Sequence, residues 1–301
     1  MDTVIQTREL CKNFGGKPAV ERLSLAVPKG AIFALLGDNG AGKTTTIRML
    51  TGLLPADSGS ATILGLDCWK AATALKSRVA YVPERPRYYD WMTVAEVGWF
   101  AAGFHAKDFL PHFQNWTGRF LLDPKAKLTQ LSKGQYAKVG LALALAIDPE
   151  VLILDEPTSG LDLLVRQDFL ASMVGLAAEG RTILISSHQI AEVERVASHV
   201  AFIAQGRLLL TASMDELRQR IVRLKVRFEG QPPDGAALGT VLTRNGSGRE
   251  WQAVLQDPRR AALDSLPQSE GIQDVEITSL HLEEIYCALL ARKEKFTEPD
   301  A

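Results

Sequence analysis

The feature that most constrains the fold is a glycine-rich stretch, Gly37–Thr44. It follows an apolar run, Ala31–Leu36, and leads into a segment typical of a helix, Thr45–Leu50. A buried strand, a glycine-rich turn and a helix form the context that the phosphate-binding pattern G-x-x-x-x-G-K-[ST] requires. Glycines let the backbone approach a phosphate closely, and the first N–H groups of the helix favour an anion. We therefore expect this loop to bind a nucleoside triphosphate.

Within this loop, Lys43 is placed to reach the β- and γ-phosphates, and the Thr44 hydroxyl to ligate Mg²⁺. The alternative is a plain turn between strand and helix, which would not need a lysine and a hydroxyl at these two positions. The candidate ATP-binding residues of the loop are Gly37, Asn39, Gly40, Gly42, Lys43, Thr44 and Thr45.

Composition narrows the class of protein. A chain of 301 residues can bury a substantial core and hold more than one domain. Its formal charge of −1 provides no basic field for nucleic acid. Three widely spaced cysteines, Cys11, Cys68 and Cys287, argue against disulfides and zinc. The longest apolar stretch, Val139–Ile147, is about half a membrane span, and the start lacks a signal-peptide pattern. We expect a soluble cytoplasmic protein without a nucleic-acid partner.

Two further apolar segments deliver polar residues at their ends. The run Val151–Leu154 is followed by Asp155 and Glu156, and a carboxylate in this place is the usual partner of a phosphate loop because it holds the Mg²⁺ shell. A strand-terminating acidic turn is the weaker alternative. A second buried strand, Thr182–Ser187, ends at His188. His199, within the strand 198–204, is expected to be structural.

Phe14 and Glu84 stand near the expected phosphate site. Residues 3–11 and 23–27 look like strands, so Phe14 is expected in an exposed turn between them. Its ring could stack on an adenine or serve only in packing, and the residues alone leave both open. Glu84 follows the strand 79–82 at its carboxyl end, where ligand groups of open α/β sheets lie.

Residues 85–147 are expected to form a helical subdomain. Segment 85–120 holds 10 of the 21 aromatic residues of the chain, so part of them must form a core. Thr93 and Glu96 form a capping box, and Ser132 is a plausible cap for a helix at 136–147. The sequence Tyr88-Tyr89-Asp90-Trp91 precedes the first helix. Aromatic residues in such a loop favour a docking surface, and packing inside the subdomain is the alternative.

The pattern changes at Ser213, which begins a second capping box. Residues 222–228 alternate strictly and carry their basic residues on one face, as expected for a half-buried antiparallel strand. A hairpin is expected between 240–244 and 250–255, and helices at 258–266 and 280–292. We therefore expect a first domain at 1–212 and a small α+β domain at 213–301, without a catalytic constellation in the second.

Taken together, five motifs in order resemble the nucleotide-binding subunit of ATP-binding cassette (ABC) transporters. The resemblance covers residues 1 to about 212. It implies an α/β P-loop NTPase cassette with a RecA-like mixed sheet core, an antiparallel β subdomain and a helical subdomain. The motifs are Gly37–Thr44, Leu131-Ser132-Lys133-Gly134-Gln135, Asp155-Glu156, Ser159-Gly160-Leu161-Asp162 and His188.

The resemblance implies roles at the matching positions. Phe14 matches the aromatic residue that stacks on adenine, and Asp155 the carboxylate that holds Mg²⁺. Glu156 matches the general base, His188 the histidine that touches the γ-phosphate, and Lys43 the phosphate-binding lysine. Hydrolysis of ATP with Mg²⁺ is the implied activity.

In this family two subunits enclose two ATP molecules. Ser132, Gly134 and Gln135 would therefore bind the nucleotide held on the partner's lysine, and Asp162 would link the two sites. This implies a second copy of the chain or a paralogous cassette as partner.

Two positions depart from the family pattern. Lys133 replaces the first glycine of the usual L-S-G-G-Q, and Glu84 stands where a glutamine is usual. A carboxylate can still ligate Mg²⁺, so Glu84 is a candidate metal ligand and catalytic residue, and it adds negative charge near the γ-phosphate. These departures, with the C-terminal domain, resemble the bacterial exporter branch, whose permease is a separate polypeptide.

The resemblance predicts an ATPase at the inner face of the membrane, docked to an integral permease near Tyr88, Tyr89 and Trp91. The alternatives are a cassette ATPase acting on ribosomes or DNA, a P-loop kinase of small molecules, and an ATP-binding protein without turnover. The first usually carries fused cassettes or long insertions. The second would not need the two motifs at 131–135 and 159–162, and the third predicts that Glu156 is missing.

Overall fold

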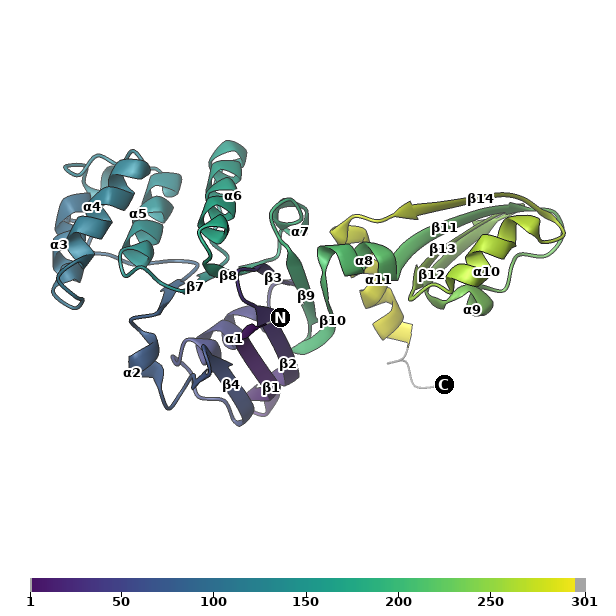
Figure 1. Ribbon diagram of the computed structural model, residues 1–301, viewed down its shortest axis with the longest axis horizontal. Helices are drawn as coiled ribbons and strands as arrows, with labels where there is room; N and C mark the ends of the chain where they lie inside the picture. The colour runs from purple at the N-terminus through teal and green to yellow at the C-terminus, as the bar shows by residue number, and fades with distance from the viewer. Residues whose placement is uncertain (1, 296–301) are drawn as a thin grey trace. The chain divides into compact units, whose positions relative to one another are not determined.

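The computed structural model describes residues 2–295, and the chain divides into two compact units between Thr211 and Ala212 (Figure 1). Among the described residues, no helix combines the length and the apolar character needed to cross a membrane.

A six-stranded sheet forms the centre of the first unit. Its strand order is β10-β9-β3-β8-β7-β6, and β3 pairs in parallel with β8 and β9, as β7 does with β6 and β8. The three central strands are buried along their whole length, as expected for a parallel sheet covered on both faces. The bounds of the strands are Ile32–Leu36 (β3), Val79–Val82 (β6), Val151–Asp155 (β7), Thr182–Ser187 (β8), His199–Ala204 (β9) and Arg207–Ser213 (β10).

Parallel pairing brings the carboxyl ends of these strands to one edge. Leu36 lies opposite Ser187, and Asp155 lies opposite Ser186. The phosphate loop after β3, the acidic pair at the end of β7 and the histidine after β8 therefore meet there. Helices that follow the strands are α1 (Lys43–Leu50), α6 (Leu163–Ala178) and the short α7 (Ile190–Val193).

An antiparallel sheet of order β2-β1-β4-β5 packs with the central sheet around one apolar core. Its strands are Thr3–Phe14 (β1), Lys17–Pro28 (β2), Ser58–Ile63 (β4) and Leu66–Asp67 (β5). Two expectations were wrong here. Phe14 ends β1 and pairs with Lys17, because Gly15 and Gly16 alone form the turn with positive φ. Ser58 begins a strand within a segment expected to be a loop.

The helical subdomain comprises α3 (Val94–Ala102), α4 (Phe109–Arg119), the 3-10 turn η1 (Leu128–Gln130) and α5 (Lys133–Leu145), with the short α2 (Ala72–Leu75) before it. Thr93 and Ser132 both head complete capping boxes. Because Ser132 is the cap, α5 begins at Lys133, three residues before the predicted start. A Cβ at Gly98 would lie 2.1 Å from the Phe113 ring, so this glycine allows α3 and α4 to pack closely.

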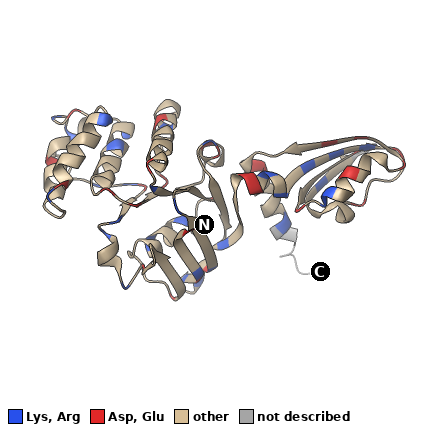
Figure 2. Cartoon of the chain, viewed as in Figure 1, with Lys and Arg blue, Asp and Glu red and all other residues tan. Residues whose placement is uncertain are grey.

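The second unit is built on an antiparallel sheet of order β12-β13-β11-β14. One face packs on a core that includes Trp251, and the other carries a row of basic side chains on β11 (Figure 2). Lys225 of this row pairs with Glu250 at 2.7 Å. The strand β14 was not predicted from the sequence. Its burial does not follow the in–out alternation that identifies a half-buried strand. The bounds are Ile221–Phe228 (β11), Thr240–Ser247 (β12), Glu250–Gln256 (β13), Ile272–Ser279 (β14), Met214–Arg220 (α8), Gly235–Leu238 (α9), Arg260–Ser265 (α10), Leu266–Gln268 (η2) and Leu282–Lys295 (α11).

Candidate active site

The phosphate loop runs from the end of β3 to the first turn of α1 and forms one wall of a cavity of about 510 Å³. Two of its glycines are required by close packing. A Cβ at Gly37 would lie 2.1 Å from the Ile203 carbonyl oxygen, and one at Gly42 would lie 2.5 Å from that of Ala19. The predicted residues that line the cavity are Asn39, Gly40, Gly42, Lys43, Thr44, Thr45, Glu84, Glu156 and His188.

Lys43 is the first residue of α1, and its ammonium group is buried among oxygen atoms. Its Nζ donates to the carbonyl oxygens of Gly37 at 2.6 Å and Asp38 at 3.1 Å, and pairs with Glu156 Oε1 at 3.0 Å. A γ-phosphate bound by Lys43 would therefore compete with the Glu156 carboxylate for the same ammonium group.

Asp155 lies at the end of β7 and is almost completely buried. Its Oδ1 accepts hydrogen bonds from the hydroxyls of Thr44 at 3.1 Å and Ser186 at 2.7 Å. Burial raises the pKa of this carboxyl above its ordinary value, and the two hydroxyl donors oppose that shift.

A divalent cation fits these groups. The hydroxyl of Thr44 and the carboxylate of Asp155 are hard oxygen donors that lie 3.1 Å apart, and Mg²⁺ prefers such donors together with substrate phosphates. No group of three or more His, Cys, Asp or Glu side chains able to hold a metal occurs within residues 2–295.

Glu156 is held from two sides. His188 Nδ1 lies 2.7 Å from its Oε2, and the His188 amide donates to the same oxygen at 3.3 Å. The Glu156 amide donates to Ser186 Oγ at 2.9 Å, and its φ of +49° lies in the left-handed region that non-glycine residues rarely adopt. The side chain is thus fixed at the mouth of the loop, next to the lysine.

Ser186 was not predicted as a site residue, although its hydroxyl bonds the Asp155 carboxylate and the Glu156 backbone. It donates to Asp155, accepts from Glu156 and is fully buried. The only feature of the sequence that could have indicated this role is that Ser186 carries a hydroxyl near the end of a buried strand. Only the register of β7 against β8 shows that this hydroxyl lies beside Asp155.

In the described part of the chain, no hydrogen bond or ion pair joins Glu84 or Phe14 to Lys43, Asp155 or Glu156, and of the two only Glu84 lines the cavity. Glu84 contributes to the cavity wall, and its Oε1 lies 3.5 Å from Arg85 Nε. The Phe14 side chain is 52% exposed, and Lys12 Nζ lies 5.7 Å from its ring centroid. The ring is therefore not a core side chain, and stacking on adenine stays a prediction.

Ser132, Gly134, Gln135 and Asp162 do not line the cavity of the phosphate loop. Ser132 and Gln135 satisfy each other's backbone N–H groups at the start of α5, and Asp162 caps α6. A Cβ at Gly134 would lie 2.3 Å from Val165, so this glycine is needed where α5 meets α6. Within one chain, the motif at 131–135 and the phosphate loop remain separate.

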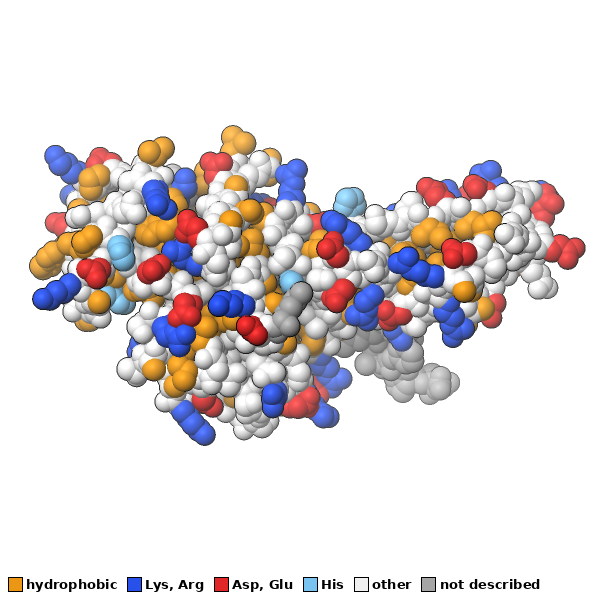
Figure 3. Space-filling view, viewed as in Figure 1, with side chains coloured by type: hydrophobic (Ala, Val, Ile, Leu, Met, Phe, Trp, Pro, Cys, Tyr) orange, Lys and Arg blue, Asp and Glu red, His pale blue; other side chains and the backbone are white. Residues whose placement is uncertain are grey.

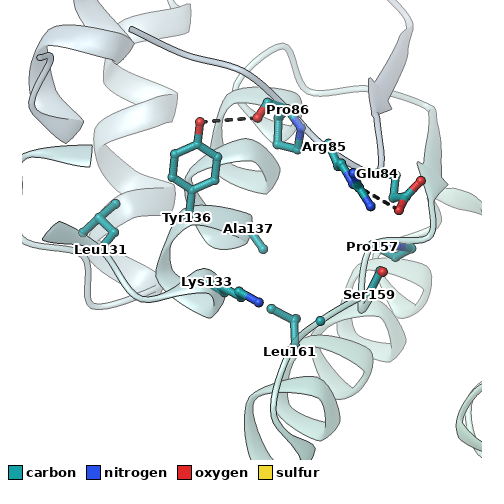
Figure 4. Close-up of a pocket in the computed structure, with 11 residues that line it drawn as sticks. Glu84, Arg85, Pro86, Leu131, Lys133, Tyr136, Ala137, Pro157, Ser159 and Leu161 are labelled. Atoms are coloured by element: carbon teal, nitrogen blue, oxygen red, sulfur yellow. Dashed lines mark hydrogen bonds and ion pairs between the residues drawn. The ribbon is translucent and has the colours of Figure 1, made fainter. Parts of the chain in front are cut away.

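A second cavity, also of about 510 Å³, lies beside the motif (Figure 4). Its walls come from three segments, 84–86, 131–137 and 157–161, and they include the Lys133 side chain. Glu84, Arg85 and Ser159 line this cavity and the cavity of the phosphate loop, so the two hollows adjoin.

The predicted aromatic cluster divides into an inner and an outer part. The Tyr88 ring packs on Tyr136 with centroids 5.4 Å apart, and burial raises the pKa of its hydroxyl. Tyr88 is therefore half-buried against α5, and its part in a docking surface stays a prediction. The exposed aromatic patch is larger than predicted, and hydrophobic side chains gather over this subdomain in Figure 3. The patch comprises Tyr89, Trp91, Trp99, Phe100 and Phe104.

A parallel sheet, a glycine-rich phosphate loop and a strand-borne acidic pair define the class of P-loop nucleotide-binding proteins. The sequence profile described as "ABC transporter" matches residues 20–159. The chain is 35% identical over 261 residues to an uncharacterised ABC transporter ATP-binding protein of Synechocystis sp., covering 83% of this chain and 72% of that protein. It is 37% identical to the bacitracin transport ATP-binding protein BcrA of Bacillus licheniformis, covering 73% of each.

A solved structure described as the ATP-binding subunit of an ABC transporter superposes with a TM-score of 0.65. It shares 29% identity with this chain, of which it covers 72%, and 92% of its own chain is matched. The chain therefore belongs to the ABC transporter family, as an ATP-binding and ATP-hydrolysing subunit. The expected fold and family are confirmed.

Proposed function

We propose that this subunit powers export through a membrane permease carried on a separate polypeptide, at the cytoplasmic face of the membrane. The support is that BcrA, a relative, is named for bacitracin transport. The cargo would be selected by that permease.

The catalytic roles follow from the contacts at the phosphate loop. Lys43 binds the β- and γ-phosphates, and Thr44 with Asp155 holds Mg²⁺. Glu156 acts as the general base for the attacking water, and its contact with His188 orients it toward the γ-phosphate. When Lys43 moves to the phosphates, Glu156 Oε1 loses its ammonium partner and becomes free to accept a proton from water.

The active unit is a dimer, either of this chain or with a paralogous cassette. The observation that carries this proposal is the separation of the two half-sites. Lys43, Glu156 and His188 share one cavity, whereas Ser132 and Gly134 lie outside it. A second chain would place its Ser132 and Gly134 on the γ-phosphate held here, with Asp162 linking the two sites.

The permease contact is assigned to the exposed aromatic patch. Aromatic side chains anchor interfaces because they bury a large area at low entropic cost. Tyr89 and Trp91 lie a few residues after Glu84, which lines the nucleotide cavity, so a movement there reaches the patch through a short segment. A kinase or a ribosome-associated ATPase would not require this surface.

The test uses Glu156→Gln, which keeps the side-chain shape and removes the base. We expect hydrolysis to slow by roughly 10²–10⁴-fold while ATP binding is retained. With ATP and Mg²⁺, sedimentation should show a dimer of this variant, and adding Ser132→Arg should abolish it. Full turnover by a strictly monomeric protein would contradict the two-chain site.

A further inference from the structure

An ion pair joins the helix that follows Asp162 to the short helix that follows His188 (Figure 1). Arg166 lies in the first turn of α6, which Asp162 caps, and Glu192 lies in α7. Arg166 Nη1 pairs with Glu192 Oε1, and the two side chains are only 16% and 20% exposed. The pair therefore connects two segments that each carry a motif of the proposed site.

The same guanidinium also holds the backbone that precedes α6. Arg166 Nη2 donates to the Leu161 carbonyl oxygen at 2.8 Å. The Leu161 amide donates to the Thr158 carbonyl oxygen at 3.2 Å. The Ser159 amide donates to the Glu156 carbonyl oxygen at 3.1 Å. Arg166 is thus connected through two overlapping turns to the backbone of Glu156.

Together these contacts form a closed path around the proposed base. One half of the path runs from Glu156 to Leu161 and Arg166. The other half runs from Glu192 along α7 to His188, whose Nδ1 lies 2.7 Å from Glu156 Oε2. The ion pair between Arg166 and Glu192 is the contact that joins the two halves.

Stability alone does not account for charged residues at this place. Within the described residues, Arg166 Nε and Glu192 Oε2 are buried without a hydrogen-bond partner. The hollow beside the pair, of about 600 Å³, has apolar walls that include Leu170, Val174 and Val196. Replacing a buried ion pair by apolar residues is often neutral or stabilising. The charges therefore point to a role in fixing the geometry of α7.

We propose that Arg166 is a positioning residue for ATP hydrolysis. With Glu192 it fixes α7, and therefore keeps the His188 ring against the Glu156 carboxylate. The inference rests on the proposed roles of Glu156 and His188. It adds a residue that does not line the nucleotide cavity.

The contact with the Leu161 carbonyl gives this role a direction. Leu161 directly precedes Asp162, which is proposed to link the two sites of the dimer. A partner subunit that engages Asp162 would therefore act on His188 of this chain through Arg166.

The test separates positioning from stability by replacing the pair with apolar side chains. Arg166→Met or Glu192→Met alone leaves a buried charge unpaired and should lower Tm, whereas the double variant should melt close to the wild type. The double variant should nevertheless show a kcat about 10- to 100-fold lower, because a misplaced catalytic group costs up to about this factor. Its KM for ATP should stay within about threefold, since neither residue lines the nucleotide cavity. Each rate is measured well below the melting transition of that variant.

A cycle with His188→Ala shows whether the pair acts through this histidine. His188→Ala alone should lower kcat by about 10²-fold or more. In that background, replacing Arg166 and Glu192 together should change kcat by less than about twofold, since residues that act through one group are not additive. A further fall as large as in the wild-type background would show that the pair acts elsewhere and would overturn the proposal.

Arg181→Met is the matched control. The Arg181 side chain is 15% exposed and pairs with Asp148 at 2.8 Å, beyond the other end of α6. Its loss should lower Tm and leave kcat per folded molecule unchanged. If it lowers kcat as much as Arg166→Met does, the effect is one of stability and the proposal is wrong.

The outcome separates this inference from the proposed function. A normal kcat of His188→Ala would contradict the proposed role of the histidine and, with it, the role of Arg166. A low kcat of His188→Ala together with a normal kcat of the double variant would refute the positioning role of Arg166 alone.

Discussion

The Ser186 hydroxyl links the Asp155 carboxylate to the backbone amide of Glu156, and Ser186→Ala should damage both stability and activity. The change removes a 2.7 Å hydrogen bond to buried Asp155 and leaves the Glu156 amide without its 2.9 Å acceptor. A hydrogen bond to a charged group contributes about 1.5–3 kcal/mol, and an orphaned buried N–H costs about 1–3 kcal/mol. We expect a loss of roughly 3–5 kcal/mol.

For a unit of this size, that loss should lower Tm by roughly 6–20 °C, measured by scanning calorimetry on the transition of the first unit. The pKa of Asp155 should rise further, because the Ser186 hydroxyl now holds it down. A proton competes with Mg²⁺ for the carboxylate, so the acid side of the ATPase pH profile should move to higher pH.

Ser187→Ala is the matched control. Ser187 is equally buried at the end of β8, but its hydroxyl bonds only the backbone of Gln189. Its removal should cost about 1 kcal/mol and leave the pH profile in place. If the two variants melt alike and show the same pH profile, the reasoning that makes Ser186 the support of the Asp155 carboxylate and the Glu156 backbone is refuted.

Three other variants test separate parts of the structure. Asp155→Asn should raise Tm while abolishing ATPase activity, because burial raises the pKa of this carboxyl and its ionised form therefore destabilises the fold at neutral pH; a lower Tm would contradict this. Gly98→Ala should cost about 1–3 kcal/mol, because its Cβ would meet the Phe113 ring at 2.1 Å, and an unchanged Tm would show that the ring moves freely. Tyr89→Ser with Trp91→Ser should leave Tm and basal ATPase nearly unchanged and weaken co-purification with the permease, since both rings are exposed. A lower Tm with intact co-purification would instead make them packing residues.

Much of the local structure followed from the sequence because short-range rules decide it. The strand at 182–187 has the predicted bounds, and the capping boxes at Thr93 and Ser213 are complete. A cap and the residue three positions later satisfy each other's backbone groups without help from the rest of the chain. The start of α5 was predicted three residues too late. Ser132 was recognised as the cap, but the residues directly after it were not counted as part of the helix.

Errors arose where pairing or packing with another segment decides the outcome. Phe14 was placed in a turn, yet pairing with Lys17 extends β1 to it. Ser58 was placed in a loop, but it pairs with Cys11 of β1. Tyr88 was grouped with its exposed neighbours, although Tyr136 of α5 covers its ring. Each of these outcomes depends on a partner that local sequence patterns do not identify.

The chemical groups of the site could be predicted from the sequence, since a phosphate loop, an acidic strand end and a histidine are fixed by residue type and spacing. The tertiary structure alone decided how these groups contact one another. The register of β7 against β8 places Ser186 beside Asp155, and the carboxyl end of the sheet brings Lys43 to Glu156. Such contacts form between residues far apart in the chain, and only the packing of strands and helices brings them within bonding distance.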